Sequence, residues 1–168
     1  MIPIGRLTKP HGLKGELVFL PYIEDLTLLP DLTEQWVHLR HRTEPDQTCS
    51  IVSWRYLHKR LLLSFHGYQT KEQADSLRNY EICVARQTFS SLPEGEYYWF
   101  DIEGLRVYDC NARLLGTITE IIHTGSNDVY VVRNRAQEFL IPALQSVVRS
   151  IDIAGGEMHL FPVQGLFD

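Results

Sequence analysis

Short runs rich in β-branched and aromatic residues follow one another along the 168-residue chain, each separated from the next by a turn signal. The first half carries IPIGRLT, ELVFL, QWVHLRH, CSIVSWRYL and RLLLSF; the second carries GLRVYD, LGTITEIIH, DVYVVRN, EFLIP and EMHLFP. Runs of this length and composition are typical of strands, and their close turn spacing favours small barrels over a helical bundle. We therefore predict an all-β (mainly β) fold, built as two small β-barrels.

The turn signals predict how neighbouring strands connect. The stretch HGLKG at 11–15 is a glycine turn between the first two strands, and Leu57–Arg60 closes a hairpin. GSND at 125–128 and AGGE at 154–157 are natural hairpin turns. Between them, Leu144–Arg149 is expected to form one short helical turn.

A single short helix is well signalled in the first half. Thr70 precedes KEQADSLRN, and Gln73 follows three residues later, which is the capping-box pattern. Ala74 and Leu77 are expected to face the core. Asn79 is expected to end the helix in a left-handed conformation, and YEICVA is the return strand.

A polar stretch containing proline, QTFSSLP, separates the two sets of strands. We predict an N-terminal barrel over 1–86, a linker over 87–93 and a C-terminal barrel over 94–168. Charge is also divided: residues 1–92 carry 11 Lys+Arg and 10 Asp+Glu, whereas residues 93–168 carry 5 and 11. This asymmetry indicates that the halves meet different partners, although small acidic domains are also common for solubility alone.

The composition argues against several classes of protein. No apolar run approaches the roughly 20 residues that span a bilayer, and MIPIGRLTKPHG lacks a signal-peptide core. The cysteines, Cys49, Cys83 and Cys110, are scattered and form no CxxC pair, which argues against a disulfide frame or a thiolate metal site. We expect a cytoplasmic protein with no membrane partner.

No motif for catalysis stands out. The glycines beside the first lysines do not make a phosphate-binding loop, and there is no nucleophile elbow. His38 and His41 form an HxxH, but residues three apart on a strand point to opposite faces, so shared metal ligation is awkward. Glu94 and Glu96 would share a strand face but lack a recognisable pocket. We expect no metal, no cofactor and no enzymatic activity.

The glycine turn at 11–15 is the main candidate for binding nucleic acid. Glycine lets backbone approach a ligand closely, and clustered cations contact RNA phosphates. An ordinary solvated turn is the equally weighted alternative. The basic residues in and before this turn are Arg6, Lys9, His11 and Lys14. The basic residues that could extend the patch from the hairpin are Arg55, His58, Lys59 and Arg60.

Four consecutive aromatic residues lie just after the predicted linker, in LPEGEYYWFD (92–101). In a strand, alternate side chains point to opposite faces, so one pair can enter the core. The other pair could serve a protein interface or stack on RNA bases, or all four could pack inside the chain. The neighbouring acids favour a basic protein over RNA. The aromatic residues are Tyr97, Tyr98, Trp99 and Phe100, and Trp99 is the one best suited to the core.

Five segments in order carry a family resemblance over almost the whole chain. They are GRLTKPHGLKGEL (5–17), GYQTKEQADSLRN (67–79), LPEGEYYWFDIEGLRV (92–107), LGTITEIIHTGSNDVYVV (115–132) and FLIPALQSVV (139–148), and the chain ends in GLFD. Together they resemble the RimM family of ribosome maturation factors.

The resemblance implies an N-terminal barrel like those of translation factors and a C-terminal PRC-type barrel. It implies a non-enzymatic assembly factor that acts on the head of the 30S subunit and favours free 30S over 70S. It also implies binding to a basic head protein, small-subunit ribosomal protein nineteen. The paired tyrosines of the family correspond to Tyr97 and Tyr98.

Two functional hypotheses follow. In the first, a monomeric chaperone uses Tyr97, Tyr98, Glu94 and Glu96 to bind protein nineteen, while the basic residues of the first barrel face 16S rRNA. In the alternative, the chain is a general RNA-binding module that acts directly on rRNA. The pI of about 5.8 argues against the alternative.

Overall fold

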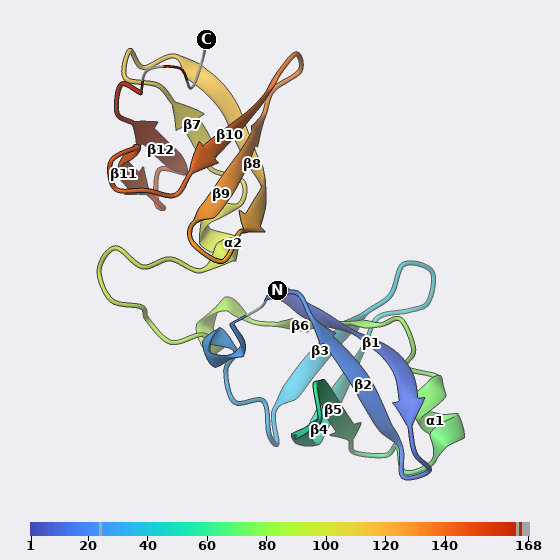
Figure 1. Ribbon diagram of the computed structural model, residues 1–168. Helices are drawn as coiled ribbons and strands as arrows, with labels where there is room; N and C mark the ends of the chain where they lie inside the picture. Colours follow the sequence, from blue (N-terminus) through green and yellow to red (C-terminus); the bar gives the residue numbers. More distant parts are fainter. Residues whose placement is uncertain (24, 164, 166–168) are drawn as a thin grey trace. The chain divides into compact units, whose positions relative to one another are not determined.

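The computed structural model describes residues 1–23, 25–163 and 165. The chain divides into two compact units, Met1–Ser91 (the first unit) and Leu92–Asp168 (the second unit) (Figure 1). Their boundary falls within the stretch predicted as a linker, and the domain limits 1–86 and 94–168 stay predictions. Most of the terminal GLFD motif lies outside the described residues.

The first unit is a closed six-stranded barrel in the order β1-β2-β5-β4-β3-β6 (Figure 1). Antiparallel pairing of β6 with β1 closes it. Two 3₁₀ helices, Leu26–Leu28 and Arg86–Thr88, flank the strands. The strands are β1 (Ile2–His11), β2 (Glu16–Pro21), β3 (Trp36–Arg40), β4 (Gln47–Leu57), β5 (Arg60–Phe65) and β6 (Glu81–Val84).

Strand alternation fills the barrel with apolar side chains and turns the polar ones outward. In β3, Val37 and Leu39 are buried, whereas His38 and Arg40 lie on the outer face. The largest fully buried side chains of the first unit are Ile4, Leu7, Leu17, Leu32, Leu39, Ile51, Leu62, Leu63, Phe65, Leu77 and Ile82.

Helix α1 (Lys71–Asp75) packs at the end of the barrel where β1 turns into β2 (Figure 1). The predicted capping box is confirmed: the backbone N–H of Gln73 donates to Thr70 Oγ1 at 3.2 Å, and Gln73 Oε1 accepts from the Thr70 N–H at 3.1 Å. Ala74 and Leu77 are fully buried, and Asn79 adopts a φ of 69°. The burial and the left-handed Asn79 are confirmed, but the helix ends at Asp75, so Asn79 does not end it.

The second unit is an open six-stranded sheet in the order β10-β9-β8-β7-β12-β11. All neighbours are antiparallel except β7 and β12. One face covers a core centred on Ile102, Val107, Val132, Ile141 and Met158. The elements are α2 (Trp99–Ile102), β7 (Arg106–Tyr108), β8 (Leu114–His123), β9 (Asp128–Arg133), β10 (Glu138–Pro142), β11 (Val148–Asp152) and β12 (Glu157–Leu160).

The prediction of an all-β fold with two strand-built units is confirmed, and one local prediction is wrong. The aromatic segment is not a strand, because the chain turns into helix α2 at Trp99. The short helical turn expected over Leu144–Arg149 is present but shorter than predicted: the N–H groups of Val147 and Val148 both donate to the Leu144 carbonyl. Val148 then begins β11, which pairs with β12. In the part of the chain that the structure describes, no helix is long and apolar enough to cross a membrane.

Candidate functional site

The aromatic segment places its two tyrosines in opposite environments. Tyr97 is 37% exposed, whereas Tyr98 is only 6% exposed. Tyr98 precedes α2 in an extended conformation, and its ring stacks on Phe100 with centroids 5.0 Å apart. Trp99, expected in the core, is only half-buried and meets Phe100 edge-on. Tyr98 is therefore packed within the chain, whereas Tyr97 is accessible to a partner.

Glutamates lie before and after this aromatic segment. Glu94 and Glu96 are exposed in the irregular stretch before Tyr97. Glu103 follows α2, where partial desolvation and then the charge of Glu120 raise its pKa. None of these four glutamates makes an ion pair within the described residues. Such a surface is complementary to a cationic partner.

Sheet pairing extends this surface with residues that sequence reasoning did not identify. Glu103 and Glu120 are brought together because the Gly104 N–H donates to the Ile118 carbonyl. Tyr130 of β9 lies near Tyr97, since burial, Asp128 and Tyr97 raise its pKa. No local sequence signal could have found these residues, because only the sheet register brings them together.

The β1–β2 turn carries Lys9 and Lys14 on the exposed surface and a half-buried His11. A Cβ at Gly15 would lie 2.2 Å from the Tyr68 carbonyl oxygen, so the turn is held tightly against the chain that leads into α1. The turn thus places its cations on a fixed backbone.

Arg55 does not extend the basic turn as a free cation. Its guanidinium forms a bidentate pair with Glu16, with Nε and Nη2 donating to the two carboxylate oxygens at 2.7 and 2.8 Å. This pair is the main reason that the pKa of Glu16 is lowered, with smaller contributions from His11 and Lys14. Arg55 therefore neutralises the carboxylate of Glu16, which lies beside the basic residues of the turn.

The basic hairpin tip lies apart from the basic turn. His58, at φ 54°, and Lys59 connect β4 to β5, as predicted. The start of β5, at Arg60, lies beside the end of β2, because Leu61 pairs with Phe19. The β1–β2 turn adjoins the other end of β2, about 17 Å away for a six-residue strand. The structure does not merge these cations into one patch.

Both histidines of the HxxH motif contact nearby groups of the β3–β4 connection. His38 Nε2 lies 3.0 Å from Asp46 Oδ2, and His41 Nδ1 accepts hydrogen bonds from two backbone N–H groups. Cys49 is buried. Among the described residues, no three His, Cys, Asp or Glu side chains gather as metal ligands. Asp128, at the end of the GSND turn, lies 2.8 Å from His123.

Comparisons with known proteins match both units. Residues 2–89 match the family model of the RimM N-terminal domain, and residues 99–166 match that of the RimM PRC barrel domain. A curated ribosome maturation factor RimM from Pseudomonas syringae pv. syringae is 39% identical over 165 residues, covering 95% of this chain and 91% of that protein. One from Geobacter metallireducens is 34% identical over 168 residues, covering 100% and 96%. A crystal structure that carries the name RimM, from Pseudomonas aeruginosa, is 34% identical, covers 96% of this chain and 97% of its own, and has a TM-score of 0.47.

Proposed function

Because the chain belongs to the RimM family of ribosome maturation factors, we propose that it assists maturation of the small ribosomal subunit and its 16S rRNA by binding alone. The observation that carries this proposal is the match of both units, in order, to the two domains of the family. The chain acts as a chaperone in the cytoplasm: it stabilises one local arrangement of the immature 30S head and leaves when mature contacts replace it.

We assign the protein-binding role to the second unit. Its net charge is −6, with 5 Lys+Arg against 11 Asp+Glu over residues 93–168. Glu94 and Glu96 precede the exposed Tyr97 in the chain, and Glu120 lies near Glu103 after α2. Such an acidic surface suits a basic protein such as small-subunit ribosomal protein nineteen. Opposite charges accelerate the encounter, and burial of Tyr97 lengthens the lifetime of the complex. Tyr98, which is buried, has a structural role and holds the neighbouring Tyr97 in position.

The first unit faces the immature head 16S rRNA in this proposal. Lys9, His11 and Lys14 make no ion pair within the described residues and project from a fixed turn. Phosphate contacts of this kind position a protein without reading sequence. A monomer that uses both units binds free 30S in preference to 70S.

Affinity for purified protein nineteen, measured by calorimetry, tests the role of the second unit. Tyr97→Ala is expected to weaken binding at least about tenfold, because it removes a large aromatic contact at the centre of the surface. Tyr56→Ala is the matched control, since Tyr56 is an exposed tyrosine of the first unit. Equal affinities for Tyr97→Ala and the wild type would remove this tyrosine from the interface.

Co-sedimentation with purified 30S and 70S particles tests the function as a whole. The protein is expected to pellet with 30S and to stay in the supernatant with 70S. Equal binding to both particles contradicts the assembly role. Tight binding to naked head rRNA without any binding to protein nineteen would instead favour the general RNA-binding module.

A further inference from the structure

A pocket of about 600 Å³ opens on the outer wall of the first unit, where β1, β3 and β6 run side by side. In the sheet register, Glu81 lies opposite Arg6 on one side and Arg40 on the other. The three side chains therefore form a row across three strands, with the two arginines about 10 Å apart at the backbone. The lining residues of this arginine pocket are Arg6, Tyr22, Arg40, His41, Arg42, Thr43, Asn79 and Glu81.

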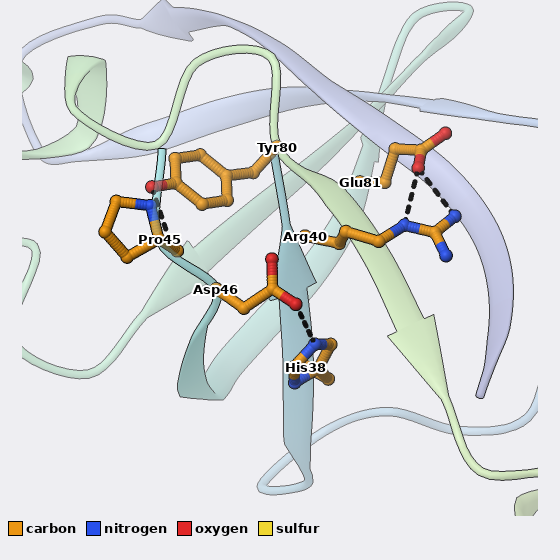
Figure 2. Close-up of polar contacts among 6 residues, drawn as sticks. All are labelled: His38, Arg40, Pro45, Asp46, Tyr80 and Glu81. Carbon is orange, nitrogen blue, oxygen red and sulfur yellow. Dashed lines mark hydrogen bonds and ion pairs between the residues drawn. The ribbon is translucent and has the colours of Figure 1, made fainter. Parts of the chain in front are cut away.

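The single carboxylate of the arginine pocket is fully engaged. Glu81 Oε1 accepts a hydrogen bond from the Tyr22 hydroxyl at 2.6 Å. Its other oxygen accepts from Arg40 Nε at 3.1 Å and from Nη2 at 2.9 Å (Figure 2). The Tyr22 bond, followed by the contacts with Arg40, lowers the pKa of Glu81, so this group stays ionised. Glu81 thus neutralises Arg40 in part and fixes the direction of its guanidinium.

The remaining two guanidinium groups make no direct ion pair among the described residues, although the charge of Arg42 also acts on Glu81. Arg6 and Arg42 are exposed and make no hydrogen bond or ion pair within the described part of the chain. With three arginines against one glutamate, the pocket has an excess of two positive charges. Guanidinium forks match the geometry of phosphate oxygens, which makes clustered arginines strong phosphate binders.

The loop that carries Arg42 is held in place at its far end by two side-chain contacts. Asp46 lies 3.0 Å from Nε2 of His38, and the Tyr80 hydroxyl donates to the Pro45 carbonyl at 3.2 Å. Figure 2 shows these contacts on either side of the chain between β3 and β4. Fixing this backbone before a ligand arrives lowers the entropy cost of binding.

His41 adds a second level of order inside the same loop. Its Nδ1 accepts from the N–H groups of Thr43 and Glu44 at 3.2 and 3.1 Å, which leaves the hydrogen on Nε2. Its ring packs against Tyr80, with centroids 4.8 Å apart. With this tautomer, His41 offers an N–H donor and a flat ring to the pocket. The exposed ring of Tyr22 offers a second flat surface.

We propose that the arginine pocket binds a backbone phosphate of single-stranded RNA, with Arg6 and Arg42 as its principal contacts. The volume of the pocket is larger than a single carboxylate needs and is large enough for a nucleotide. The rings of Tyr22 and His41 border the pocket. The choice of RNA as ligand rests on the proposed function, and the pocket identifies contacts beyond the β1–β2 turn.

Binding of a fluorescein-labelled oligouridylate of about eight nucleotides to the full-length protein tests this proposal. Arg6→Gln and Arg42→Gln are each expected to weaken binding about fivefold and to lower the slope of log K against log salt by about 0.7. Arg78→Gln is the matched control, because it removes the same charge from the first unit but from an arginine paired with Asp75. It is expected to change the affinity less than about twofold.

Three outcomes would overturn the proposal. In the first, Arg6→Gln and Arg42→Gln behave like Arg78→Gln. In the second, polyglutamate of the same length displaces the RNA at similar concentration, which makes the pocket a site for acidic proteins. In the third, the oligonucleotide binds no more tightly than inorganic phosphate at equal ionic strength, which makes it a site for free anions.

The same variants in 30S co-sedimentation separate this proposal from the proposed function. If the wild type binds oligouridylate through Arg6 and Arg42 but fails to bind 30S, the pocket stands and the assembly role fails. If the wild type binds 30S while all three arginine variants bind oligouridylate alike, the assembly role stands and the pocket fails.

Discussion

At the scale of single residues, neighbours in sequence have divided roles. Tyr97 is exposed while Tyr98 is buried against Phe100, so the two tyrosines that the family resemblance paired are not equivalent. The alternation of side chains expected for a strand predicts opposite environments for these two residues. The environments do differ, but the segment is not a strand. The difference arises because the chain leaves an irregular stretch and enters α2 at Trp99.

Glu81 provides a pH-dependent test at this scale. Its pKa is lowered from 4.5 by Tyr22 and Arg40, so its contacts stabilise the fold above the unfolded-state value and are lost as the pH falls through the folded one. Glu81→Gln is expected to lower the free energy of unfolding by about 1 kcal/mol at about pH 7, because the pair is partly exposed. The difference should shrink at an acid pH below the unfolded-state value of 4.5, as Glu81 becomes protonated.

Urea denaturation at the two pH values measures this effect. Glu72→Gln is a suitable control, because Glu72 is exposed in the first turn of α1 and makes no ion pair within the described residues. A difference between Glu81→Gln and the wild type that stays constant from neutral to acid pH would contradict the role given to Glu81.

At the scale of elements, the sequence predicts local structure well where the signal involves only neighbouring residues. It predicts less well where distant parts of the chain decide the conformation. Thr70 and Gln73 predicted the start of α1 because a capping box involves only residues three apart. The aromatic run has high strand propensity, yet its second half, Trp99 and Phe100, lies in α2, which buries Ile102. The turn that ends at Val147 was extended too far, because strand pairing with β12 decides the conformation of Val148.

The β1–β2 turn yields a paired prediction. Gly12 and Gly15 both have positive φ, at 64° and 77°, but only Gly15 lies against the Tyr68 carbonyl. Gly12→Ala is expected to cost about 1 kcal/mol for the left-handed backbone alone. Gly15→Ala is expected to cost at least about 3 kcal/mol, because the turn must also move away from the chain before α1.

Thermal or urea unfolding of both variants measures the contrast. Equal losses would show that the close approach of Gly15 to Tyr68 contributes nothing to stability. Since the same turn carries Lys14, Gly15→Ala should also weaken binding to 30S more than Gly12→Ala does.

At the scale of the whole molecule, the functional surfaces depend on pairings between distant parts of the chain. Arg40 and Glu81 are 41 residues apart and meet only because β3 pairs with β6. The sequence HLRHR contains the density of cations that signals the arginine pocket, but the register that sets Arg6 beside Glu81 is a property of the closed barrel. Sequence reasoning found Arg6 and missed Arg40 and Arg42 for this reason.

Each unit is expected to fold alone, because each has its own sheet and buried core. Separately expressed fragments 1–91 and 92–168 should each show cooperative unfolding and dispersed amide resonances. The first fragment should retain oligouridylate binding, and the second should retain protein nineteen binding. A fragment that is unfolded on its own would show that its core needs the other unit.

The parallel pair β7–β12 has a consequence for the synthesis of the protein. Arg106 of β7 lies opposite Glu157 of β12. The sheet of the second unit therefore stays incomplete until β12 has been translated. The barrel of the first unit is complete once β6 has been translated, because β6 closes it by pairing with β1 as far as Val84. Domains fold as units in the order in which they emerge from the ribosome. The first unit is therefore expected to fold while the second unit is still being made.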